Sequence, residues 1–169
     1  MNSINITARA KINLSLEVKG KRSDGYHLLS MVMQTVDISD RIKISENRTG
    51  RINIAGNTDR IPFDARNIGF RAAVRFLREI RSGRGYDIFI EKNIPSGAGM
   101  GGGSADAAAV LAGLNYMNHE PLSMNRLMEL GLELGADVPF CLAGGTRLAE
   151  GIGEEFTQLR DLDLNLLIV

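Results

Sequence analysis

The first eighteen residues alternate between polar and apolar side chains. Positions 4, 6, 8, 10, 12, 14, 16 and 18 are Ile, Ile, Ala, Ala, Ile, Leu, Leu and Val, and the odd positions between them are mostly polar. A period of two is typical of a β-strand with one buried face. Because the pattern is longer than an ordinary strand, it predicts a bend or two consecutive strands.

The rest of the chain shows strand patterns first and helical patterns later. We predict a polar loop over 20–27, a strand over 28–38, a hairpin of 41–45 with 51–55, a helix with apolar positions from 70 to 80 that ends at 82–83, a strand over 86–91, helices over about 104–118 and 123–134, and short strands around 145–149, 154–158 and 164–169. This order favours an α+β fold with a mostly antiparallel sheet over a doubly wound fold.

Length and composition fit a single ordinary domain. The chain has 169 residues, and twenty basic residues balance twenty acidic ones, so no net field attracts nucleic acid or an anionic membrane. The single cysteine, Cys141, excludes an internal disulfide and fits a reducing compartment. The N-terminus lacks the apolar block of a signal peptide, and the apolar run "AAAVLAGL" is too short to cross a bilayer. We therefore expect a cytoplasmic protein.

A cluster of glycines precedes the most helical stretch of the chain. Five of the nineteen glycines lie between Gly97 and Gly103, and an alanine-rich run follows. Glycines let the backbone approach an anion closely, and a helix N-terminus offers unpaired amides and partial positive charge. With Ser104 as the expected N-cap, the pattern indicates a nucleotide phosphate site. A flexible loop before an ordinary capped helix is the alternative interpretation.

Two other phosphate motifs do not explain the loop. Gly97, Gly99 and Gly102 match G-x-G-x-x-G, the fingerprint of dinucleotide-binding proteins, which directly follows a strand and needs an acidic residue at the end of the next strand. Here residues 93–95 separate the glycines from the preceding strand. The acidic residue at the right distance, Glu120, stands in a loop before Pro121. The G-x-x-x-x-G-K-[ST] motif is absent, because no lysine follows Lys92. The positive charge for phosphates is therefore expected from elsewhere in the chain.

Four motifs in order resemble the superfamily of galactokinase, homoserine kinase, mevalonate kinase and phosphomevalonate kinase (the GHMP kinases), and within it the cytidine-specific subgroup. They are "ARAKINL" at 8–14, "RSDGYH" at 22–27, "PSGAGMGGGSADAA" at 95–108 and "GADVPF" at 135–140. Met100 and Ala105 stand where leucine and a second serine are usual in that subgroup. The resemblance covers residues 1–169 and implies the N-terminal, ATP-binding domain of such a kinase, without the C-terminal domain that completes the cleft.

The resemblance implies an activity and its site. The implied reaction is ATP-dependent phosphorylation, with Mg²⁺, of the 2-hydroxyl of 4-diphosphocytidyl-2-C-methyl-D-erythritol in the non-mevalonate route to isoprenoids. The resemblance implies catalytic roles for Lys11 and Asp137, and Asp137 would accept the proton of the hydroxyl. The substrate would contact Asn13, Tyr26, His27 and Asp137. The nucleotide would contact Asn67, Pro95, Ser96, Gly97, Ala98, Gly99, Met100, Gly101, Gly102, Gly103, Ser104 and Ala105, and Ser104 is a candidate contact for the metal. A homodimer is compatible with the resemblance.

Without the resemblance, these residues have simpler interpretations. Lys11 and Asn13 share the polar face of the first strand, which is typical of a solvated surface. Asp137 before "VPF" has the position of an N-cap, and the pair Tyr26–His27 usually packs. Asp106 would repel a nearby phosphate, so it is expected to point away or to help hold the metal.

An RNA-binding module is the alternative of a different class, since the fold is shared with ribosomal protein domains. Arg71, Arg75, Arg78 and Arg81 are spaced three or four apart on one helix and could form a basic stripe. Zero net charge and few aromatic residues favour a solvated helix face instead. Another small-molecule kinase of the superfamily is the alternative within enzymes, and Tyr26 with His27 argues against it.

Overall fold

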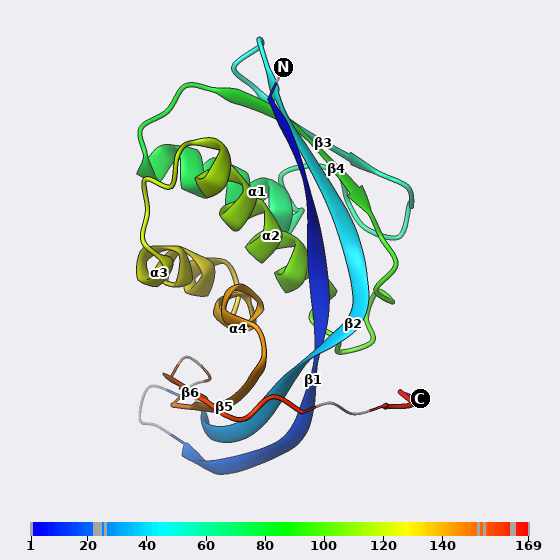
Figure 1. Cartoon of the computed structure of the whole chain (residues 1–169), viewed down its shortest axis with the longest axis vertical. Coiled ribbons are helices and arrows are strands. Elements are labelled where there is room, and N and C mark those ends of the chain that lie inside the picture. The colour runs from blue at the N-terminus through cyan, green and yellow to red at the C-terminus, as the bar shows by residue number, and fades with distance from the viewer. Residues whose placement is uncertain are drawn as a thin grey trace.

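Two long antiparallel strands run the length of the molecule (Figure 1). They are β1 (Ser3–Lys21) and β2 (His27–Asn47), and their register shifts three times, between Arg9 and Lys11, between Asn13 and Ser15, and between Val18 and Gly20. The computed structural model describes residues 2–21, 25, 27–151, 153, 155–162 and 165–168. The predicted long strand is thus confirmed as one strand, and irregularities of this kind let it bend.

The six strands form one sheet with mostly antiparallel pairing, as the sequence predicted. The further strands are β3 (Ile52–Gly56), β4 (Gly85–Glu91), β5 (Thr146–Glu150) and β6 (Glu155–Gln158). Their order is β3-β4-β2-β5-β6, and β1 pairs with β2 outside this path. Only the β3–β4 pair is parallel among the described strands.

The predicted hairpin of 41–45 with 51–55 is wrong. Residues 41–45 continue β2, and β4 inserts between β2 and β3 and pairs with both. The inward side chains of β4, Tyr86, Ile88 and Ile90, are almost fully buried, whereas β3 is only half-buried. The more apolar strand takes the central position because it buries more surface there, and β3 is left at the edge.

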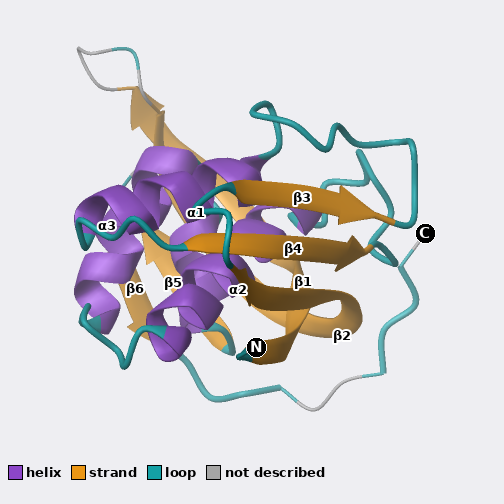
Figure 2. Ribbon diagram, turned by 90° about the horizontal axis from the view of Figure 1, so that it is seen from above, coloured by secondary structure: helices purple, strands orange, loops and turns teal. Residues whose placement is uncertain are grey.

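The helices of the described residues, four in number, cover one face of this sheet (Figure 2). They are α1 (Ile68–Glu79), α2 (Gly102–Met117), α3 (Met124–Leu134) and α4 (Val138–Ala143). Helix α2 is the central one, since residues from Ala105 to Leu111 are buried on all its sides. The predicted helix over 123–134 is confirmed as α3, and the Ser123 hydroxyl caps it by accepting from the backbone N–H of Arg126.

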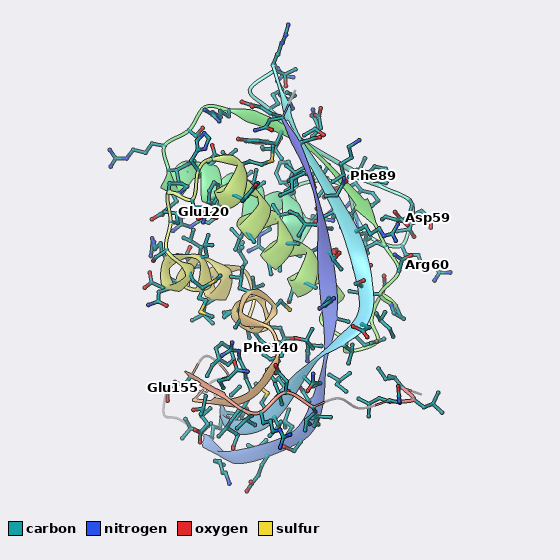
Figure 3. All side chains as sticks on the ribbon, viewed as in Figure 1. Asp59, Arg60, Phe89, Glu120, Phe140 and Glu155 are labelled. Carbon is teal, nitrogen blue, oxygen red and sulfur yellow. The ribbon has the colours of Figure 1, made fainter. Side chains whose placement is uncertain are left out.

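A smaller core lies at the other end of the molecule, between α4 and strands β2 and β5. Phe140 of α4 is buried there with Met31, Met33 and Ala149, and its ring packs 6.2 Å from that of Phe156 on β6. Figure 3 shows Phe140 in this position, whereas Asp59 and Arg60 project from the opposite side. This second core holds α4 against the long strands.

The end of the chain differs from the prediction. The strands expected near 145–149 and 154–158 are present, but residues 165–168 form no strand, and Leu164 and Val169 lie outside the described residues. Leu167 is 90% exposed, so the apolar character of these residues alone did not produce a strand. Among the described helices, none is long and apolar enough to cross a membrane.

Candidate functional site

The glycine loop and the start of α2 form a concave backbone surface. Gly97, Gly99 and Gly101 all have positive φ, and they alternate with residues that do not. Alternating conformations of this kind turn successive amides toward a common side, which makes an anion-binding nest. The segment from Pro95 to Gly103 lines one side of a cavity of about 270 Å³.

Ser104 does not cap α2, contrary to the prediction. The helix begins two residues earlier, Gly101 is its N-cap with φ of 68°, and the amide of Ala105 already bonds to the carbonyl of Gly101 at 2.8 Å. Within the described residues, no side chain caps the N-terminus of this helix. These amides are therefore available to a ligand, and the half-buried Ser104 stands in the first turn.

Lys11 and Asp137 meet beside the loop. Lys11 Nζ lies 3.4 Å from Asp137 Oδ2, and the Lys11 side chain is 7% exposed while that of Asp137 is 34% exposed. Asp137 does precede α4, but it has helical φ and ψ and its side chain caps no amide, so its carboxylate is free to face Lys11. Asp137 thus holds the N-cap position of α4, as the simpler interpretation had it, but its side chain makes no cap hydrogen bond.

The first strand is joined directly to the loop. At the register shift after Arg9, the backbone N–H of Lys11 donates to the carbonyl of Met100 at 3.0 Å. A Cβ on Gly101 would lie 3.0 Å from Lys11 Cγ, so only glycine lets the lysine stem lie this close. Asn13 Oδ1 accepts from Lys11 Nζ at 3.4 Å. The structure thus brings Lys11, Asn13, Asp137 and the loop together.

Asn67 lies on the other side of the cavity and caps α1. Its carbonyl oxygen accepts from the amides of Gly69 and Phe70, and its amide donates to the carbonyl of Pro62. Asn67 also lines the cavity, with Ile61 and Ile68 among its neighbours there. The side chain is 6% exposed, so it fixes the cavity wall.

Sequence reasoning missed a charged cluster beneath the loop. Lys92 Nζ pairs with Asp40 on β2 and with Asp106 on α2. The period-two alternation of the sequence could have indicated that Lys92 is buried, because it follows the inward-facing residues Tyr86, Ile88 and Ile90 at the same spacing. The pKa of Asp106 is raised to about 7, because burial and the charge of Asp40 together outweigh the opposite effect of Lys92. Asp106 therefore neither points into solvent nor stands free.

The structure describes one of the two expected substrate contacts Tyr26 and His27. Tyr26 lies outside the described residues, and His27 is an exposed residue at the start of β2, paired across the sheet with Lys21. Figure 1 shows this end of β1 and β2 far from the start of α2 on the same bent sheet. The structure does not bring His27 to the Lys11–Asp137 pair.

The arginines of α1 do not form an uninterrupted basic stripe. Arg75 pairs with Glu79 on its own helix and with Glu133 on α3, and both carboxylates raise the pKa of Arg75. Arg126 of α3 pairs with the same Glu79. The middle of the stripe is thus neutralised, as expected for a solvated helix face rather than an RNA-binding surface.

Comparisons with known proteins agree with this geometry. Residues 67–145 match the model described as GHMP kinases N terminal domain. The chain is 49% identical to the 4-diphosphocytidyl-2-C-methyl-D-erythritol kinase of Clostridioides difficile (strain 630), over 99% of this chain and 57% of that protein. It is also 49% identical to the kinase of that name from Alkaliphilus oremlandii (strain OhILAs), over 100% of this chain and 58% of that protein.

Solved structures show the same relationship. A crystal structure of 4-(cytidine 5'-diphospho)-2C-methyl-D-erythritol kinase superposes with a TM-score of 0.78 and 36% identity, over 92% of this chain and 55% of that one. The mevalonate kinase of Methanococcus jannaschii superposes with a TM-score of 0.72 at 15% identity, over 94% and 56%, which is a likeness of fold alone. The chain spans a little more than half the length of these relatives.

Proposed function

Because the chain belongs to the GHMP kinases, we propose that it is the nucleotide-binding part of an ATP-dependent kinase that phosphorylates the 2-hydroxyl of 4-diphosphocytidyl-2-C-methyl-D-erythritol. The observation that carries this proposal is the Lys11–Asp137 pair, 3.4 Å apart beside the uncapped N-terminus of α2. The names of the relatives that are 49% identical support the acceptor. A C-terminal domain of the relatives' kind would complete the cleft.

The loop would bind the phosphates of ATP. The free amides at the start of α2 and the nest before them offer hydrogen bonds and partial positive charge. The cavity between residues 61–68 and 92–106 would take the nucleoside. Because the loop supplies backbone groups, the rest of the positive charge has to come from lysine side chains.

Asp137 and Lys11 would act on the transferred group. Asp137 would orient the acceptor hydroxyl and take its proton, and Lys11 would offset the charge that develops on the phosphoryl oxygens. Phosphoryl transfer depends mostly on positioning and electrostatics, so a lysine, a carboxylate and a backbone cradle are sufficient. Asn13, bonded to Lys11 Nζ, would hold the lysine or contact the acceptor.

Mg²⁺ fits this site as an ion held mainly by phosphates. The described residues hold no group of three or more His, Cys, Asp or Glu side chains that could bind a metal by themselves. Magnesium usually takes few protein ligands when substrate phosphates are present. The Ser104 hydroxyl, in the first turn of α2, would be its protein contact, and the ion would neutralise phosphate charge.

The decisive experiment measures ADP release with 4-diphosphocytidyl-2-C-methyl-D-erythritol and with galactose, homoserine or mevalonate. It uses the chain alone and a version extended at the C-terminus to the length of its relatives. Asp137→Asn is expected to abolish turnover while ATP still binds, and Glu155→Gln, on the exposed surface of β6, is expected to change neither. Near-normal turnover of Asp137→Asn would refute the catalytic role of Asp137. Faster turnover of another acceptor would refute the substrate. A homodimer and a cytoplasmic location stay predictions.

A further inference from the structure

Helix α4 carries Asp137 at its start and has six residues (Figure 1). The backbone carbonyl of Asp137 accepts from the amide of Cys141 at 3.0 Å, so Asp137 moves with the helix. Six helical residues rise only about 9 Å, and a helix this short is not stable by itself. Contacts with the rest of the molecule therefore decide where α4 holds the Asp137 carboxylate.

The turn that follows α4 is built from two glycines. Gly144 has φ of 61° and Gly145 has φ of 78°. The amide of Gly144 still belongs to the helix, because it donates to the carbonyl of Phe140 at 2.8 Å, whereas the carbonyl of Gly145 accepts from the amide of Thr35 on β2 at 3.0 Å. Glycine has the greatest backbone freedom of all residues, so the bonds between these two groups form a pivot at which α4 can tilt against the sheet.

Arg147 on β5 spans this pivot. Its Nε donates to the carbonyl of Gly144 at 2.8 Å, and its Nη2 donates at 3.1 Å to the carbonyl of Ala143, the last residue of α4. Carbonyls at the end of a helix have no partner within it, and a cation there also interacts favourably with the helix dipole. The planar guanidinium presents its donors in a rigid fork, so it holds both carbonyls in one geometry.

The same face of β5 also supports the middle of α4. Arg147 pairs across the sheet with Met33, and Ala149 follows two residues later on the same face. Met33 and Ala149 are buried together with Phe140 of α4, which is 1% exposed. Strand β5 thus holds α4 by its apolar side and by its C-terminal carbonyls, and Asp137 stands at the opposite end of the helix.

We propose that Arg147 is a positioning residue for Asp137. By closing the pivot at Gly144, it fixes the direction of α4, and with it the 3.4 Å separation between the Asp137 carboxylate and Lys11 Nζ beside the glycine loop. The Asp137 side chain is 34% exposed, so the helix that carries it, rather than a surrounding pocket, sets its place. This inference rests on the proposed catalytic role of Asp137.

Arg147→Met keeps an unbranched apolar stem and removes both donors. In the chain extended to the length of its relatives, kcat is expected to fall about tenfold or more, because a small displacement of a catalytic group costs at least this much. The KM for Mg-ATP is expected to stay unchanged, since Arg147 is not among the residues that line the cavity beside the loop. Arg147→Lys keeps a cation without the fork, so an intermediate kcat is expected, and this variant carries the test if the methionine variant does not fold.

Tyr86→Phe is the matched control for stability. It removes a hydroxyl that bonds to Asn118, the residue that ends α2 at the far side from the loop. The change is therefore expected to lower the free energy of unfolding without touching α4. Urea unfolding places the variants on one stability scale, and the kcat of Tyr86→Phe is expected to equal that of the unchanged protein.

Alkylation of Cys141 by iodoacetamide tests the same link without turnover, in the 169-residue chain, where Cys141 is the single cysteine. Arg147→Met is expected to speed the reaction in the folded protein about threefold or more, because α4 opens more often, and Tyr86→Phe is expected to leave the rate unchanged.

The outcomes separate this inference from the proposed function. Equal alkylation rates in Arg147→Met and Tyr86→Phe, an unchanged kcat in Arg147→Met, or a KM for Mg-ATP that rises as kcat falls overturns the inference alone. An extended chain of unchanged sequence that turns over no acceptor refutes the proposed function, and this inference with it.

Discussion

The backbone N–H of Lys11 donates to the carbonyl oxygen of Met100 at 3.0 Å. The bond joins β1 to the glycine loop at the residue whose side chain pairs with Asp137. The irregularity in β1 after Arg9 is what releases this amide from the β1–β2 ladder. The position of the lysine is therefore set by its backbone as well as by its side chain.

Gly101→Ala tests this relationship. Gly101 has φ of 68°, where an alanine costs about 1–2 kcal/mol, and its new Cβ would lie 3.0 Å from Lys11 Cγ. We expect loss of Lys11 from its place, weaker ATP binding and a fall in turnover of at least tenfold, with the fold retained. ATP titration and urea unfolding measure these effects. Gly83→Ala, in open space, is the matched control, and equal behaviour of the two variants would contradict the role of Gly101.

Asp106→Asn is expected to change how stability depends on pH. Because the pKa of Asp106 rises from 3.8 unfolded to about 7 folded, the native state holds a proton that the unfolded state releases between these values. The contribution of this bound proton to the free energy of unfolding is complete below pH 4 and is lost as the pH rises through 7. Between pH 5 and pH 8 the loss is about 2 to 3 kcal/mol for this group.

The asparagine variant lacks this loss, so its unfolding free energy should rise relative to the unchanged protein from pH 5 to pH 8. Lys92 remains paired with Asp40 in the variant, which avoids an unpaired buried ammonium. Urea unfolding at both pH values, without nucleotide, measures the difference. Parallel pH profiles for the two proteins would mean that Asp106 is ionised throughout.

Cys141 is expected to be unreactive in the folded protein. Burial, and then the charge of Asp137, raise the pKa of its thiol to about 12, and the thiolate is the reactive form. At pH 8 alkylation by iodoacetamide should be at least tenfold slower than in urea. The rate of alkylation in the folded protein measures how often α4 opens and exposes Cys141. A native rate equal to the unfolded rate would show that α4 does not protect the thiol.

Local patterns predicted the parts of the fold that depend on local physics. Period-two alternation identified β1, and the helical spacing of apolar residues from 70 to 80 identified α1. The predicted hairpin was wrong because strand pairing depends on residues that are distant in the sequence. No local pattern indicates that β4 lies between β2 and β3. Ser104 failed as a cap because the glycines before it already continue the helix.

The site divides in the same way. The loop could be found from its glycines, but the pairing of Lys11 with Asp137 could be anticipated only through resemblance, since on the sequence each had a simpler interpretation. On the sequence, Lys92 stands out only as the last lysine of the chain. Lys92 directly follows β4 and continues the alternation of the inward-facing Ile88 and Ile90, which is a periodicity signal that could have identified it.

The contacts of Lys11 also set an order of events during synthesis. Its two partners, Met100 and Asp137, lie about 90 and 126 positions later in the chain. A nascent polypeptide can build the β1–β2 pair early, but it holds Lys11 without its carboxylate until α4 has left the ribosome. Contacts this distant in sequence form slowly, so the Lys11–Asp137 pair should be among the last of the described contacts to form.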